Sequence, residues 1–284
     1  MAPPTCEESW APLPFSWRQV RKAFGAWKTY IYALMYIGTT QPLYSLALFT
    51  PTIIKELGYS NANANFLSVP PYFFGFLTTL LVAIVSDRLL QRGIFIIGEM
   101  LSVIVGYAIL LTNVSSGIKY FVLFLCVGGC NPCIATAITL IGNKLVHCLL
   151  YSLICISPSL SRGYGPVYTR AAAMGFFFSV GNSAGLISSN VYPSGAAPRY
   201  FRGHGIALAF SFLAIVCVSI LMVSNLRENA RRDRVYGVAA PDGSDAHPHK
   251  VLIPDQKATW GLEGLSELQI IELGDRHPGF RYVL

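Results

Sequence analysis

The sequence predicts an all-α integral membrane protein with six transmembrane helices, and two observations lead to that class. The 284 residues are 53% apolar and only 12% charged, whereas charged residues make up about a quarter of an average soluble protein. The mean hydropathy is +0.50. The apolar residues also fall into blocks of about the length that a helix needs to cross a hydrocarbon core of ~30 Å. We therefore expect this chain in a lipid bilayer.

The clearest pair of spans surrounds a short charged island. Residues 65–85 contain no charged side chain, and residues 94–112 form a second apolar block. The island between them reads Ser86-Asp87-Arg88-Leu89-Leu90-Gln91-Arg92-Gly93. It is too short and too charged to be anything but a tight turn at the membrane surface. We therefore expect two helices that cross in opposite directions.

Four further apolar blocks complete the set of spans. They are residues 29–54, 119–141, 171–192 and 204–223. The first contains Gly38, Pro42 and Pro51, so a kinked helix is expected there. The second contains the sequence Gly-Gly-Cys-Asn-Pro at 128–132, which predicts a weakened helix near the middle of the membrane.

These spans divide the chain into three regions. Residues 1–28 form a polar, Pro-rich and basic cytosolic segment, residues 29–223 the six-helix transmembrane unit, and residues 224–284 a charged cytosolic tail. No cleavable signal peptide is expected, because the first 28 residues have no apolar core. Residues 144–163 contain an apolar run of only 12 residues. That run is too short to span, so we expect a loop or an interfacial segment.

The Lys and Arg residues predict that both termini are cytosolic. Six spans place thirteen of them on one side and four on the other, and the more basic side faces the cytosol. The thirteen are Arg18, Arg21, Lys22, Lys28, Arg88, Arg92, Lys144, Arg162, Arg170, Arg227, Arg231, Arg232 and Arg234, and the four are Lys55, Lys119, Arg199 and Arg202. The net charge of +7 is therefore assigned to topology, and no nucleic-acid partner is expected.

No residue pattern predicts an enzyme, a metal site or a cofactor. The sequence has no His-Glu-x-x-His motif, Ser-His-Asp set or phosphate-cradling glycine loop. Cys126, Cys130 and Cys133 share one helical face, but no His or carboxylate accompanies them. All seven cysteines are expected to be reduced and to pack as small apolar side chains.

The charged island and several other stretches resemble the major facilitator superfamily. In that family a Gly-x-x-x-Asp-Arg-x-Gly-Arg-Arg pattern joins helices 2 and 3, and a weaker copy joins helices 8 and 9. Asp87, Arg88 and Arg92 match it, whereas Ala83, Leu90 and Gln91 replace a Gly, a Gly and an Arg. The match suits the weaker copy. The stretches at 32–36, 42–45, 65–72, 197–204 and 272–282 look like the C-terminal half of fungal anion:cation symporters, the allantoate and nicotinate permease group.

The resemblance implies one half of a twelve-helix carrier. The family passes from Gly142 and Asn143 almost directly to Tyr164, so residues 144–163 look like an insertion. The implied function is secondary active transport of a small organic anion, such as a carboxylate, a vitamin or an allantoate-like compound. Symport with a cation, expected to be the proton, would drive it, and the expected place is the plasma membrane. The implied partners are the anion, the proton, the lipid bilayer and a six-helix N-terminal half. The alternative is a truncated membrane half-protein or assembly partner that does not transport.

The resemblance also gives meaning to uncharged polar residues inside the spans. Carriers of this class bind substrate near the middle of the membrane, where interrupted helices and uncharged polar groups can contact it at little desolvation cost. Gln41, Tyr44 and Tyr36 on the first span, Asn131 on the fourth and Asn182 on the fifth are the candidate substrate-binding residues. Each tyrosine has a simpler interpretation as an interfacial or packing aromatic residue. The small residues Gly181 and Gly185 predict close helix packing.

Four charged residues are candidates for coupling and gating. Glu99 is the one carboxylate well inside a span. It either couples transport to protons or forms a packing pair with the charged island two turns away. Asp87, Arg88 and Arg92 form either a cytosolic latch that holds one conformation of the carrier or, for the arginines, a plain topology signal. Asp87 contributes little to topology, so its presence favours the latch.

Overall fold

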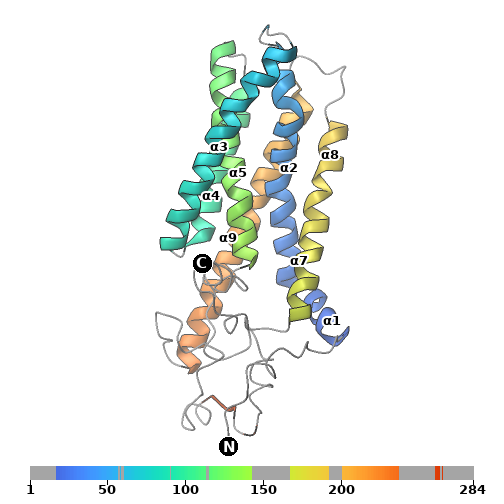
Figure 1. Ribbon diagram of the computed structural model, residues 1–284. Coiled ribbons are helices and arrows are strands. Elements are labelled where there is room, and N and C mark those ends of the chain that lie inside the picture. Colours follow the sequence, from blue (N-terminus) through green and yellow to red (C-terminus); the bar gives the residue numbers. More distant parts are fainter. Residues whose placement is uncertain are drawn as a thin grey trace, which may run out of the picture.

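The described part of the chain is helical throughout its regular structure. A computed structural model describes residues 17–56, 58, 61–89, 91–112, 115–142, 167–191, 200–236, 260–262 and 264. Within these residues the helices are α1 (Trp17–Gly25), α2 (Trp27–Glu56), α3 (Asn61–Leu89), α4 (Arg92–Leu110), α5 (Ser116–Gly142), α7 (Val167–Asn182), α8 (Ala184–Val191) and α9 (Phe201–Tyr236) (Figure 1). The predicted all-α fold is confirmed for this part of the chain.

The long helices lie side by side in one bundle, with α2 near its middle (Figure 1). α2 contacts α5 on one side, the α7–α8 column on the other, and α9 along much of its length. α5 packs against α3 and α4, and α9 also packs against α4. The short helix α1 lies against α7, where Phe24 meets Phe176 edge to face. Because α2 touches every part of the bundle, its residues decide how the two sides fit together.

The predicted spans correspond to the long helices, with differences in two places. Among the described residues, four helical stretches are long and apolar enough to cross a membrane, namely Ala62–Leu89, Arg92–Leu110, Gly117–Leu140 and Phe201–Val235. α2 has 30 residues and is long enough, but its Thr, Gln, Ser and Pro residues make it less apolar. α7 and α8 have 16 and 8 residues. Each alone is shorter than the ~20 residues that a membrane-spanning helix needs, and only the two together reach that length. α2 and the α7–α8 column still lie roughly parallel to the other helices in the bundle (Figure 1).

The helices expected to be weakened by proline remain continuous. α2 contains Pro42 and Pro51, and α5 contains Pro132, without an interruption in either helix. An apolar environment offers no water to a freed backbone group, so the helix persists and side chains supply hydrogen bonds. Pro42 leaves the carbonyl oxygen of Gly38 without its intrahelical partner. One turn before the proline, the Thr39 hydroxyl donates to the carbonyl oxygen of Tyr36. Neither helix is interrupted at its prolines; the kink expected in 29–54 and the weakening expected at 128–132 stay predictions.

The interruption lies instead at Ser183, between α7 and α8. Thr40 Oγ1 of α2 donates to the carbonyl oxygen of Gly181 at 3.0 Å. In an undisturbed α-helix this carbonyl accepts from the amide of Gly185. A side chain that inserts into the backbone ladder is a known cause of a helix break. A neighbouring helix therefore helps to place this break, which is not predictable from the 171–192 segment alone.

The last helix extends beyond its predicted end at residue 223. α9 has 36 residues and ends at Tyr236, so 224–236 continue the helix and are not linker-like. Glu228 forms ion pairs with Arg231 and Arg232, three and four residues later. Such pairs lie on one helix face and stabilise it. The predicted insertion at 144–163, residues 1–16 and most of the predicted tail lie outside the described residues.

Small residues allow the central helices to approach closely. A Cβ atom at Gly38 of α2 would lie 2.8 Å from the carbonyl oxygen of Phe210 and 3.0 Å from the backbone nitrogen of Ala214, both on α9. Cβ atoms do not approach backbone atoms so closely, so a side chain at position 38 would force α2 and α9 apart. Small residues at helix interfaces play this part in membrane bundles.

Replacing Gly38 by Ala should therefore destabilise the bundle. Overpacking costs about 1–3 kcal/mol, which should exceed the gain of ~1 kcal/mol from the better helix former. Gly98→Ala is the matched control, because a Cβ there would meet nothing within 4 Å, and it should be neutral or stabilising. Thermal unfolding in detergent, followed by circular dichroism, measures both. Equal midpoints for the two variants would contradict the close approach of α2 and α9.

Candidate functional site

A cluster of uncharged polar side chains joins α2 to the α7–α8 column. We call it the polar junction and define it as Gln41, Tyr44, Ser45, Asn182 and Ser188. Tyr44 Oη donates to Asn182 Oδ1 at 2.7 Å. Two candidate residues from distant parts of the sequence therefore contact each other. The bond lies one residue from the helix break at Ser183.

Gln41 lies at the buried part of the polar junction. Its side chain is 0% exposed, and its Nε2 donates to Ser45 Oγ at 3.0 Å. Ser45 Oγ in turn lies 3.3 Å from Ser188 Oγ, and Ser188 Oγ lies 3.4 Å from the carbonyl oxygen of Gln41. Within the described chain, Gln41 Oε1 is buried without a hydrogen-bond partner. Such a group is unusual in a folded interior and is a reason to look for a ligand.

Sequence reasoning missed Ser45 and Ser188. Ser45 lies four residues after Gln41, so both share one face of α2, and that spacing is a signal that could have found it. Ser188 carries no such signal, because its partners lie on another helix. Both side chains are buried.

Tyr36 and Asn131 each pack against a glycine of a neighbouring helix. Tyr36 is buried, its ring covers Gly181 and it meets Phe178 edge to face. Asn131 of α5 lies against Gly75 of α3. Among the described residues, no hydrogen bond links either side chain to Gln41. The structure therefore brings Tyr44 and Asn182 together, and places Tyr36 and Asn131 in helix packing.

Glu99 lies between α4 and α5. Its side chain is 8% exposed, and Thr136 Oγ1 lies 3.5 Å from its Oε1. The thiols of Cys130 and Cys133 are close enough to interact with the carboxyl group. Its Oε2 has no hydrogen-bond partner in the described part of the chain. No ion pair with Arg88 or Arg92 occurs among the described residues, so the neighbours of Glu99 are neutral.

The charged island forms an ion pair across the turn between α3 and α4. Arg92 Nη2 donates to Asp87 Oδ1. The Arg92 side chain is only 7% exposed, whereas that of Asp87 is 40% exposed. Arg92 Nε and Nη1, and the hydroxyl of Ser86, are buried without a partner among the described residues. Arg88 is exposed. The buried cation therefore depends on a single carboxylate for its charge.

The cysteines in the described helices pack as apolar residues. Cys126, Cys130 and Cys133 of α5, and Cys217 of α9, are free thiols and are buried. No group of three or more His, Cys, Asp or Glu residues that could hold a metal ion occurs in the described ranges.

Comparison with known proteins identifies transporters. No family model and no solved structure matches the chain. The high-affinity nicotinic acid transporter of Saccharomyces cerevisiae is 30% identical over 222 residues, which are 78% of this chain and 38% of that protein. An uncharacterized transporter of Schizosaccharomyces pombe is 32% identical over 239 residues, or 82% of this chain and 45% of that protein.

A major facilitator-type transporter of Emericella nidulans is 25% identical over 272 residues, which cover 94% of this chain and 47% of that protein. The chain therefore spans less than half the length of each of these relatives. All three carry the name of a transporter and none that of an enzyme. The matches extend over most of the chain, and its described residues include four helices long and apolar enough to cross a bilayer. Over most of its length the chain is therefore similar to membrane transporters, among them transporters of the major facilitator type.

Proposed function

We propose that this chain is the C-terminal six-helix half of a secondary active transporter that moves a small organic anion together with a proton. The observation that carries the proposal is the polar junction, in which Gln41 keeps an unpartnered amide oxygen inside an apolar bundle. A buried polar group without a partner is costly, so a ligand that reaches it would be stabilised. The superfamily places substrates near the middle of the membrane, between its two halves.

The chemistry of the polar junction suits a small carboxylate. Tyr44, Ser45 and Ser188 supply hydroxyl groups, and the Gln41 and Asn182 amides supply both donors and acceptors. Rotation of the Gln41 amide exchanges its oxygen and nitrogen, so this group can meet either kind of ligand atom. The Saccharomyces relative is named a nicotinic acid transporter, and nicotinic acid is a small carboxylate at neutral pH. Tyr36 then acts by holding α2 against α7, whereas Asn131 packs α5 against α3.

Glu99 is the proposed proton-binding group. Ionisable residues within membrane spans are expensive and often belong to proton pathways. Glu99 lies among neutral neighbours, Thr136 and the two thiols, so no fixed cation locks its charge. A carboxyl group in such a place can gain and lose a proton during the transport cycle.

Asp87, Arg88 and Arg92 are the proposed latch on the cytosolic side. The ion pair of Asp87 with the buried Arg92 joins the end of α3 to the start of α4. The unpartnered nitrogens of Arg92 could pair with further groups in another conformation of the carrier. Its formation and release would then favour one state over another.

Residues 1–284 on their own should not carry substrate. Alternating access comes from two halves that move about a shared site, so one half supplies only part of it. Uptake of labelled nicotinate into proteoliposomes should appear only when the chain is co-reconstituted with the N-terminal six helices of a relative. Saturable, gradient-driven uptake by the 284 residues alone would overturn this proposal. A chain that shows no uptake with any such partner would favour the non-transporting alternative.

Loss of the Tyr44–Asn182 hydrogen bond should weaken substrate binding in the complete assembly. A neutral hydrogen bond is worth ~0.5–1.5 kcal/mol, so Tyr44→Phe and Asn182→Ala should each raise KM by about two- to twelvefold. Tyr30→Phe and Asn190→Ala are the matched controls, because both side chains are exposed and bind only local carbonyl or hydroxyl oxygens. Uptake kinetics at several nicotinate concentrations measure the effect. If the control variants change KM as much, the junction does not bind substrate.

Replacing Glu99 by Gln should separate proton coupling from substrate movement. The amide keeps the size of the side chain but cannot bind and release a proton. Accumulation driven by a proton gradient should be lost, while exchange of labelled for unlabelled substrate without a gradient should persist. Glu228→Gln changes an acid of α9 that is ion-paired with Arg231 and Arg232, and it should leave accumulation intact. Normal gradient-driven accumulation by Glu99→Gln would rule out its coupling role.

Because Arg92 is buried and Asp87 is partly exposed, removing Asp87 should destabilise the protein more than removing Arg92. Asp87→Ala leaves a buried cation without its counter-charge, which costs ~3–5 kcal/mol in a fully buried pair and less here because Asp87 is partly exposed. Arg92→Met leaves only a partly solvated carboxylate and should cost less. The double variant Asp87→Ala/Arg92→Met should recover stability relative to Asp87→Ala. Unfolding midpoints in detergent test this order, and the reverse order would contradict it.

Both termini are proposed to be cytosolic. The start of α2, the α3–α4 turn and the end of α9 lie at one end of the bundle (Figure 1), and their basic residues include Lys28, Arg88, Arg92 and Arg227. Basic ends face the cytosol. Glycosylation tags at each terminus should stay unmodified when the chain is made in microsomes, whereas tags in the turn between α4 and α5 should be modified. A glycosylated terminus would show that this end of the chain is not cytosolic and would contradict the proposed topology.

A further inference from the structure

A groove of about 820 Å³ lies where the start of α2 meets the last turns of α9. Its α9 wall includes Ile220, Val223, Arg227 and Arg231, and its α2 wall Trp27 and Lys28. None of these six residues belongs to the polar junction or to the latch. The groove is therefore separate from the proposed transport machinery.

The α9 wall changes from apolar to cationic along the helix. Ile220, Val223, Arg227 and Arg231 are spaced by three, four and four residues, so they lie on one helix face. Ile220 and Val223 are exposed. Arg227 is also exposed and forms no hydrogen bond or ion pair with another described residue. A ligand in the groove would meet an apolar surface at one end and guanidinium groups at the other.

The groove lies at the level of the lipid headgroups. α9 has 36 residues and is about 54 Å long at 1.5 Å per residue, well beyond the ~30 Å hydrocarbon core. Its apolar part ends near Val223, so Arg227 and Arg231 extend past the core. Trp27 is 53% exposed, and tryptophans favour the interface between lipid and water.

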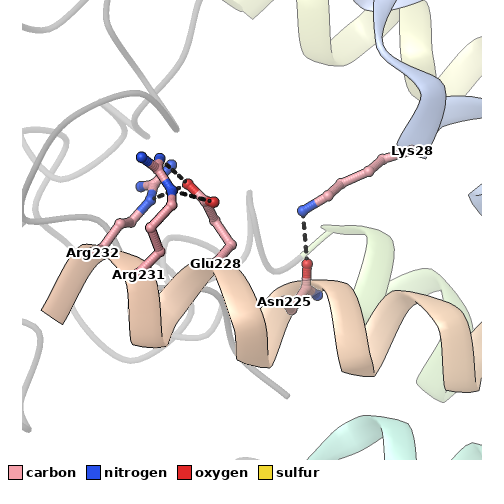
Figure 2. A network of polar contacts seen from close by, with 5 residues as sticks. All are labelled: Lys28, Asn225, Glu228, Arg231 and Arg232. Carbon is pink, nitrogen blue, oxygen red and sulfur yellow. Dashed lines mark hydrogen bonds and ion pairs between the residues drawn. The ribbon is translucent and has the colours of Figure 1, made fainter. Parts of the chain in front are cut away.

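Polar contacts hold the two walls together and leave the groove cationic. Lys28 Nζ donates to Asn225 Oδ1 at 3.0 Å, which ties α2 to α9 (Figure 2). Glu228 accepts from Arg231 and from Arg232 at 2.8–3.0 Å (Figure 2). Among the described residues that line the groove there are three cations, Lys28, Arg227 and Arg231, and one carboxylate, Glu228. The excess is positive.

We propose that this groove binds the headgroup of an anionic glycerophospholipid. The phosphate and the anionic headgroup lie between Arg227 and Lys28, and the acyl chains lie along Ile220 and Val223. Basic pockets between helices on the cytoplasmic side of membrane proteins are suited to such lipids. The groove has both apolar and cationic walls, so it fits a lipid better than free phosphate, which has no apolar group to place on Ile220 and Val223. Trp27 lies against the glycerol region.

The test uses the full chain, purified in detergent, and native mass spectrometry with added phosphatidylserine or phosphatidylcholine of the same acyl chains. Wild-type protein should retain phosphatidylserine and not phosphatidylcholine. Arg227→Gln should weaken phosphatidylserine binding about fivefold, the effect of one basic residue near an anionic surface. Arg227→Lys should keep it. Arg234→Gln is the matched control, because it removes an exposed arginine from α9 that does not line the groove. Circular dichroism confirms that each variant is folded.

Three outcomes would overturn the proposal. Equal retention of the two lipids would show that charge does not select the ligand. An equal loss in Arg227→Gln and Arg234→Gln would show diffuse attraction to the helix and no site. Binding of millimolar inorganic phosphate, or its displacement of phosphatidylserine, would assign the groove to free phosphate. None of these readings depends on substrate transport, so the proposal can fail or stand independently of the proposed function.

Discussion

The structure depends on one constraint, which is that α2 carries polar groups through the middle of an apolar bundle. Thr39, Thr40, Gln41, Ser45 and Thr50 are all almost fully buried. Without water, each must find its hydrogen bonds inside the protein. Thr50 donates to the carbonyl oxygen of its own helix one turn earlier, whereas Thr40 and Ser45 also reach the α7–α8 column. The polar groups of α2 therefore determine which helices lie beside it.

Other contacts extend the same pattern to the rest of the bundle. Tyr107 of α4 donates through its hydroxyl to the carbonyl oxygen of Pro42 at 2.9 Å, and Lys28 binds Asn225 of α9. Gly38 lets α9 approach closely between these two points. α2 is thereby tied to α4, α8 and α9 by specific contacts and not by apolar packing alone. Arg92 of the α3–α4 turn begins the helix that carries Tyr107.

The sequence predicts the helices well because apolar blocks of membrane length can hardly be anything else. It predicts less about where helices break. Prolines mark α2 and α5 as weak, yet both persist, and the break occurs at Ser183 beside a hydroxyl from another helix. The extension of α9 carries the Glu228 ion pairs, which stabilise a helix and which hydropathy does not count. Each miss comes from a contact between or along helices, which apolar block length does not encode.

The candidate site shows the same limit. Residue type and depth select Gln41, Tyr44 and Asn182, and the structure brings Tyr44 and Asn182 into contact. Those criteria also select Asn131, whose side chain packs on Gly75, and they pass over Ser188. Serine is common in membrane helices, and only its position opposite Ser45 makes it part of the junction. Partners on different helices become visible only once the bundle is assembled.

The most direct measurement is a disulfide between positions 45 and 188. The two serine oxygens lie 3.3 Å apart, so cysteines there should be close enough to join. In a chain whose seven native cysteines are replaced, Ser45→Cys/Ser188→Cys should form the bond under mild oxidation, as mass spectrometry of the linked peptides would show. Ser45→Cys/Ser189→Cys, with the exposed neighbour on α8, should remain reduced. A bond in the second pair and none in the first would contradict the polar junction.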